Sequence, residues 1–226
     1  MAFCPCSWIR SWCTLWGMYR HRIVCLGDSI TASKSVGVLE GWPALLQLHL
    51  QERGPWCVYN RGVSGETIRQ GLDRLDKDVL PLLPAIVLIE FGLNDSSFKP
   101  KSTIPRVIPQ DFRICLQEIT ERIRSGGGKP ILVINHPLGR PDPILPNRLH
   151  RQLYLARYHA ITRTLAKKKK YPLLDLHHRL KAKYALPWQA HALNRDGVHL
   201  NKRGHEMYAH ALIQELSRWL PGILPT

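Results

Sequence analysis

Residues 22–31 read Arg22-Ile23-Val24-Cys25-Leu26-Gly27-Asp28-Ser29-Ile30-Thr31, an apolar run that ends at a glycine and is followed by a serine. Consecutive apolar residues of this kind are typical of a strand buried on both faces. A serine directly after such a strand can cap the next helix, or it can be placed at the sheet edge for chemistry. Only the second hypothesis requires a base and an orienting carboxylate elsewhere in the chain.

Further short apolar runs follow and alternate with amphipathic stretches. We expect strands at 23–26, 56–59, 85–91, 130–134 and 171–174, and helices at roughly 42–52, 66–79, 110–124, 149–169 and 202–219. This alternation predicts a three-layer α/β sandwich with a parallel sheet and right-handed crossovers. No internal repeat or linker divides the sequence, so residues 21–226 are predicted to form one domain.

The first twenty residues fit neither a helical nor a strand period. They also lack the basic segment followed by an apolar stretch that marks a signal peptide. We expect residues 1–20 to be disordered, or the true start of the protein to be Met18.

The composition favours a soluble protein with a large core and an excess of positive charge. Hydrophobic residues make up 44% of the chain, and 32 basic against 17 acidic residues give a net charge of +15. No apolar run reaches the roughly 20 residues that span a bilayer. The charge favours anionic partners, including weak contact with an anionic surface, but no motif for nucleic acid accompanies it.

The six cysteines do not have the spacing of a zinc or redox site, and they do not form a disulfide framework. This favours a reducing compartment, and hence the cytoplasm, over the periplasm or a secreted location.

Polar residues follow each predicted strand, at 27–29, 60–65, 92–95, 135–136 and 175–178. The carboxyl ends of parallel strands share one edge of the sheet, which is where ligands bind in open α/β folds. Before the last predicted helix, Asp196 and His199 lie three residues apart. A turn of that length can bring the carboxylate to one imidazole nitrogen and leave the other to face Ser29 as a base.

Four segments together resemble the SGNH, or GDSL, hydrolase superfamily, and in particular its lysophospholipase, thioesterase and arylesterase group. They are RIVCLGDSIT (22–31), NRGVSGET (60–67), FGLND (91–95) and DGVHLNKRGH (196–205), and they stand in the family's order. The resemblance implies a flavodoxin-like sandwich with five parallel strands in the order 2-1-3-4-5. It also implies an esterase that needs no metal or organic cofactor.

The same resemblance implies roles for five residues. Ser29 would be the nucleophile, His199 the general base and Asp196 its orienting carboxylate. The N–H groups of Ser29 and Gly65 and the side-chain amide of Asn94 would form the oxyanion hole. The substrate would be a small acyl ester or thioester.

Four more residues are candidates for substrate binding. Asp28 and His136 stand beside strand exits, while Lys99 and Arg140 lie in two proline-rich loops that leave the same edge of the sheet. The two cations are expected near the mouth of the site, where they would attract anionic substrates.

Other hypotheses compete with this one. An α/β-hydrolase would need a second glycine in its G-x-S-x-G elbow, where this chain has Thr31. A metal-dependent hydrolase could draw ligands from His136, Asp175, His177, Asp196 and His199, and Asp175 with His177 could instead form an acid–base pair ahead of a polar turn at 178–179. A non-catalytic module could bind polyanions through a basic helix and its end, namely Arg148, Arg151, Arg157, Arg163 and Lys167-Lys168-Lys169-Lys170.

Overall fold

The structure, a computed structural model, describes residues 21–140, 142–184 and 191–219. The expectations for residues 1–20 lie outside the described residues, as does the part of the predicted domain beyond residue 219.

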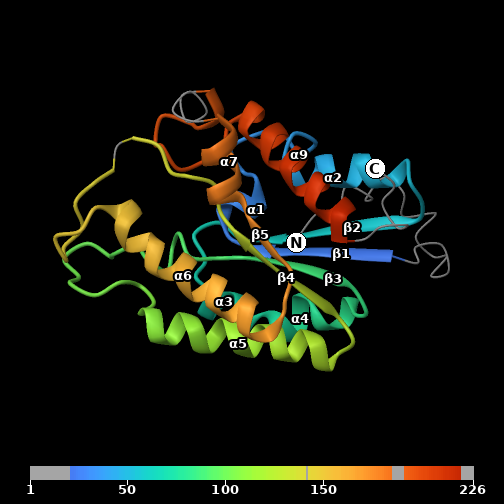
Figure 1. Cartoon of the computed structure of the whole chain (residues 1–226), viewed down its shortest axis with the longest axis horizontal. Coiled ribbons are helices and arrows are strands. Elements are labelled where there is room, and N and C mark those ends of the chain that lie inside the picture. Colours follow the sequence, from blue (N-terminus) through green and yellow to red (C-terminus); the bar gives the residue numbers. More distant parts are fainter. Residues whose placement is uncertain (1–20, 141, 185–190, 220–226) are drawn as a thin grey trace.

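A five-stranded sheet forms the centre of the fold (Figure 1). Its strands are β1 (His21–Gly27), β2 (Trp56–Gly62), β3 (Ile86–Glu90), β4 (Lys129–Ile134) and β5 (Leu173–Asp175). Every neighbouring pair is parallel and the order is β2-β1-β3-β4-β5. Both the α/β class and the predicted strand order are confirmed.

The strands are apolar on both faces because each face is covered by helices. Along β1, Ile23 and Cys25 join one buried cluster, while the alternate residues Val24 and Leu26 join the other. Successive side chains of a strand point to opposite faces, so this alternation shows that the sheet separates two cores.

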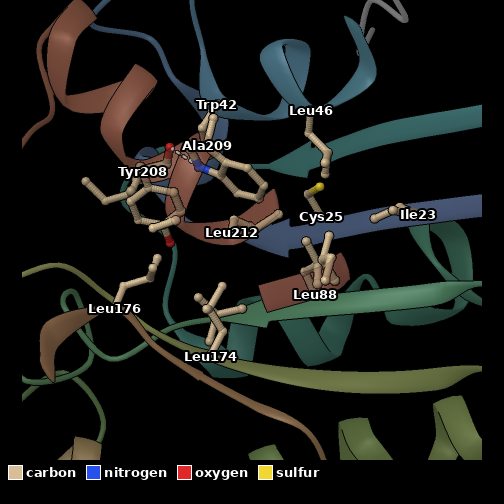
Figure 2. Close-up of a cluster of buried hydrophobic side chains, with 14 of the residues drawn as sticks. Ile23, Cys25, Trp42, Leu46, Leu88, Leu174, Leu176, Tyr208, Ala209 and Leu212 are labelled. Atoms are coloured by element: carbon tan, nitrogen blue, oxygen red, sulfur yellow. Dashed lines mark hydrogen bonds between the residues drawn. The ribbon is translucent and has the colours of Figure 1, made fainter. Parts of the chain in front are cut away.

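Helices α2 (Trp42–Gln51), α7 (Leu176–Tyr184) and α9 (Lys202–Trp219) cover one face of the sheet. Figure 2 shows this core, in which Trp42 of α2 stacks on Tyr208 of α9 with ring centroids 5.3 Å apart. The other face is covered by α3 (Ile68–Asp73), α4 (Leu75–Asp78), α5 (Pro109–Ser125) and α6 (Arg151–Lys169).

Two local predictions were wrong. The helix expected at 66–79 is two short helices, α3 and α4, which are separated at Arg74. The polar turn expected at 178–179 is part of α7. Asp175 accepts a hydrogen bond from the N–H of His178 at 3.0 Å, and Leu176 and Leu180, four residues apart, are both buried.

Candidate active site

Ser29 is the first residue of α1 (Ser29–Ala32), a four-residue helix that begins directly after β1. Asp28 caps this helix, because its Oδ1 accepts a hydrogen bond from the N–H of Ile30 at 2.9 Å. Ser29 is half-buried and Asp28 is fully buried. The strand thus delivers a serine to the carboxyl edge of the sheet, and the preceding residue holds the turn.

His199 and Asp196 lie with Ser29 in one line of hydrogen bonds, although 170 residues separate the serine from the histidine. Nε2 of His199 is 3.0 Å from Oγ of Ser29, and Nδ1 is 2.6 Å from Oδ2 of Asp196. The N–H groups of Val198 and His199 donate to the other oxygen of Asp196, at 2.9 and 3.0 Å.

The charge of Asp196 fixes the tautomer of His199. Partial burial acts to raise the pKa of Asp196, but hydrogen bonds from the His199 ring and from two backbone N–H groups outweigh it and hold this pKa below its usual value. An ionised carboxylate only accepts hydrogen bonds, so Nδ1 of His199 carries the proton. Nε2 therefore presents a lone pair to the hydroxyl of Ser29.

The loop after β4 holds the turn that carries Asp196 and His199. Gly139 donates from its N–H to the carbonyl of Gly197 at 2.7 Å, and Nε2 of His136 lies 2.8 Å from the carbonyl oxygen of Val198. Gly197 has φ of +67°, and a Cβ there would come within 2.4 Å of the Arg140 carbonyl oxygen. Only glycine permits both this conformation and this close approach.

The amide of Asn94 links the loops that carry the other expected oxyanion donors. Its Nδ2 donates to the carbonyl of Glu66 at 2.9 Å and to Oδ2 of Asp28 at 3.2 Å. Glu66 follows Gly65 and Asp28 precedes Ser29, so these two bonds hold the three donor segments together. Gly65 adopts φ of +80°, which favours glycine.

Two charged side chains brace these loops. Arg74 binds the carboxylate of Glu66 at 2.7 Å and the carbonyl of Arg61 at 2.8 Å. Asp95 accepts from the N–H groups of Ile68 and Gly92 at 2.8 and 2.9 Å, which ties the loop after β3 to α3. Burial raises the pKa of Asp95 to about 6 despite these bonds.

Two buried carboxyl groups, those of Glu90 and Asp28, lie close to α1 and Ser29. Glu90, the last residue of β3, is buried and accepts a hydrogen bond from the hydroxyl of Thr31 in α1. Burial raises the pKa of Glu90 well above its usual value, and the nearby Asp28 raises it further. The pKa of Asp28 is itself raised, to about 7, chiefly by burial.

Of the four residues predicted to bind substrate, Lys99 and Arg140 are exposed at the carboxyl edge. Asp28 and His136 are both fully buried. Neither side chain is open to solvent, and the hydrogen bonds of this pair position α1 and the Asp196–His199 turn.

The five residues of the metal alternative do not form one cluster, although Asp196 and His199 are in contact. Asp175 pairs with Arg163 at 2.7 Å, and no group of three or more His, Cys, Asp or Glu among residues 21–140, 142–184 and 191–219 has the arrangement of a metal site. Asp175 and His177 lie at the start of α7, and the ring of His177 packs against that of His159 with centroids 5.1 Å apart.

Sequence reasoning missed the buried polar residues that support the site, above all Glu90, Thr31 and His205. His205 accepts a hydrogen bond on Nδ1 from the N–H of Trp42 at 3.3 Å, and burial lowers its pKa to about 4. A glutamate inside the apolar run 85–91 was the one available signal, because a buried acid needs a partner.

Comparison with known proteins identifies the family of the chain. Residues 25–207 match the model of the GDSL-like Lipase/Acylhydrolase family. Esterase TesA of Pseudomonas aeruginosa is 32% identical over 114 residues, which is 50% of this chain and 53% of that protein. The chain thus spans about half the length of this relative.

Two longer matches cover most of the chain. The Escherichia coli K12 protein "Thioesterase 1/protease 1/lysophospholipase L1" is 28% identical over 86% of this chain and 82% of its own length. A lipase/acylhydrolase from Enterococcus faecalis superposes with a TM-score of 0.70 at 26% identity, over 88% of this chain and 97% of that one. The resemblance seen in the four sequence segments is confirmed, and the chain belongs to the GDSL-like lipase/acylhydrolase family of ester hydrolases.

Proposed function

We propose that this protein hydrolyses acyl esters or thioesters through a covalent acyl-enzyme intermediate on Ser29. The observation that carries the proposal is the continuous line of bonds from Ser29 Oγ to His199 Nε2 and from His199 Nδ1 to Asp196. A serine hydroxyl is a weak nucleophile until an oriented base takes its proton, and this line supplies both the base and the group that orients it.

In the first half-reaction, Nε2 of His199 takes the hydroxyl proton while Oγ of Ser29 bonds to the substrate carbonyl carbon. The tetrahedral intermediate then collapses, and His199 returns the proton to the departing alcohol or thiol. In the second half-reaction, His199 takes a proton from water, whose oxygen attacks the acyl carbon. The bond from that carbon to Oγ of Ser29 then breaks, His199 returns the proton to Oγ, and the carboxylic acid leaves. Asp196 stays ionised and stabilises the imidazolium.

The N–H groups of Ser29 and Gly65 and the amide of Asn94 are the proposed oxyanion donors. Asn94 uses its amide for Glu66 and Asp28 in the structure. An oxyanion would compete with the Asp28 contact, which is the longer of the two at 3.2 Å.

The polyanion-binding alternative has less support. Arg163 is paired with Asp175 at 2.7 Å, and Lys169 with Glu121 at 2.9 Å. Two of the basic residues of α6 therefore form ion pairs within the protein. Lysines at a helix C-terminus also complement the helix dipole.

A hydrolysis screen tests the proposed function and narrows the substrate. The panel should hold p-nitrophenyl esters of graded chain length and acyl-CoA thioesters, assayed with the wild type, Ser29→Ala and His199→Ala. Both variants should lose nearly all turnover, and a fluorophosphonate should label the wild type but not Ser29→Ala. An active Ser29→Ala protein would refute the nucleophile assignment.

A further inference from the structure

The most exposed large apolar side chains of the described residues lie in loops at the carboxyl edge of the sheet and at the start of α6. Five side chains are more than half exposed: Val38 (78%), Ile144 (68%), Ile104 (65%), Leu153 (63%) and Leu39 (59%). We call these five residues the apolar rim. They lie in the loops that follow α1, β3 and β4 and in the first turn of α6.

The segments that carry the rim are bonded to the turn that carries Asp196 and His199, and to one another. On one side, Ser35 donates from its hydroxyl to the carbonyl of Leu200 at 2.7 Å, directly after His199. On the other side, the loop after β4 reaches the turn through Gly139.

The loop after β3 packs on α6, with the rings of Phe98 and Tyr154 5.6 Å apart and the Tyr158 hydroxyl bonded to the Val107 carbonyl at 2.7 Å. Figure 1 shows the loops after β3 and β4 projecting beyond the strand ends, beside the start of α6. Two of the loops that carry the apolar rim are therefore bonded directly to residues 197–200, beside His199.

Positive charge surrounds the apolar rim. Exposed cations of the same loops are Lys34, Lys99, Lys101, Arg140 and Arg148. The loops at 33–41, 96–108 and 137–150 hold two acids, and both are engaged. Glu40 pairs with Lys202 at 2.8 Å, and Asp142 accepts from the N–H of Gln152 at 3.0 Å.

Exposed aliphatic side chains within a ring of cations suit a lipid surface. Aliphatic groups gain free energy on entering the headgroup boundary, and each nearby lysine or arginine is attracted to anionic lipids. A nucleic acid would use the cations but not the isoleucines, and small soluble esters require neither over so wide an area.

We propose that the apolar rim and its cations dock this protein on the surface of an anionic membrane, with Ser29 facing ester bonds in that surface. The catalytic part of this statement rests on the proposed function. The docking itself requires no turnover.

Ser29→Ala protein allows the docking to be measured by co-sedimentation with vesicles. It should bind vesicles of phosphatidylglycerol and phosphatidylcholine in equal parts, bind phosphatidylcholine alone much less, and dissociate in concentrated salt. The added pair Ile104→Ser and Ile144→Ser should lower the partition coefficient tenfold or more, by roughly the effect of withdrawing two aliphatic side chains. The pair Lys101→Gln and Arg148→Gln should lower it roughly 30-fold.

Matched controls lie away from this edge. Leu48→Ser near the end of α2 removes an exposed leucine, and the pair Lys167→Gln and Lys168→Gln removes two exposed cations at the far end of α6. Neither control should change the partition coefficient more than about twofold. Thermal unfolding of every variant checks that each one is folded.

The docking proposal is overturned if anionic vesicles bind no better than neutral ones, or if the control substitutions weaken binding as much as the isoleucine pair and the cation pair. It is also overturned if the isoleucine pair has no effect and a DNA duplex competes fully, which would indicate a general polyanion site. With Ser29 intact, the isoleucine pair should keep its activity on a soluble short-chain ester. A wild-type protein that hydrolyses this ester but does not bind anionic vesicles would refute the docking and leave the proposed function standing.

Discussion

Substitutions of His136 test how the turn that carries Asp196 and His199 is held in place. Its Nε2 lies 2.8 Å from the Val198 carbonyl oxygen, one residue before His199, and its side chain is fully buried. Burial lowers the pKa of His136 to about 4, and the histidines nearby, His205, His177 and His199, act in the same direction. Above that pH the ring is therefore neutral and donates its Nε2 proton to the carbonyl.

The magnitude follows from proton linkage. An unfolded histidine titrates near 6.5, so the unfolded chain binds a proton between pH 6.5 and 4 that the native state excludes. The free energy of unfolding that depends on His136 is fully present above pH 6.5 and falls by about 3 kcal/mol as the pH drops to 4. His136→Gln keeps an amide donor but does not titrate, so it does not show this loss.

Urea unfolding of the wild type, His136→Gln and His136→Phe at pH 7 and pH 4.5 measures the effect. The free energy of unfolding of the glutamine variant should improve relative to wild type by roughly 2–3 kcal/mol on acidification. The phenylalanine variant leaves the Val198 carbonyl without its donor and should lose roughly 1–3 kcal/mol at pH 7. Its kcat should fall about tenfold, which corresponds to a loss of roughly 1.4 kcal/mol of transition-state stabilisation. The glutamine variant keeps the donor, so its kcat should stay near that of the wild type.

An equal difference between His136→Gln and wild type at both pH values would show that His136 is not a buried neutral donor. Wild-type kcat in His136→Phe would show that the bond to Val198 does not position His199.

Asn94→Ala should lower kcat by roughly 10²–10³ with little change in Tm, whereas a purely structural Asn94 would lower Tm and spare kcat. Glu90→Gln should become more stable relative to wild type as the pH rises from 5 to 8. An acid whose pKa is raised in the native state loses its contribution to stability as the pH rises through that pKa. A constant difference in unfolding free energy would mean that Glu90 is ionised in the native state. Lys99→Glu with Arg140→Glu should abolish the salt dependence of kcat/KM for an anionic ester and leave that for a neutral ester unchanged, and an equal response of both esters would remove these cations from substrate selection.

The sequence was sufficient to predict the sheet. Strands buried on both faces are continuous apolar runs, and the cores on either side of β1 and β3 account for that pattern. The break of the 66–79 helix at Arg74 could not be read in this way. Arg74 leaves the helical pattern while its side chain bonds Glu66 and Arg61, and these tertiary contacts have no local sequence signal.

The polar residues at strand exits were also predictable as candidates for the site, because parallel strands end at one edge of the sheet. The buried residues that hold them in position were not predictable in this way. The sequence alone predicts His136 and Asp28 as substrate contacts, because a position beside a strand exit does not reveal which way a side chain points. Burial distinguishes a positioning residue from a binding residue, and it depends on the loops that close over the site.

The placement of Ser29 illustrates why these supports matter. A four-residue helix is too short to be stable alone, so contacts from elsewhere must fix α1. Asp28 caps its first turn, Thr31 is anchored on Glu90 of β3, and the indole N–H of Trp42 donates to the Ile30 carbonyl at 3.0 Å. The sheet and α2 thereby hold the serine hydroxyl within 3.0 Å of His199, which itself depends on the loop after β4. The serine at the exit of β1 does begin a helix, but that helix is held where a base can reach it.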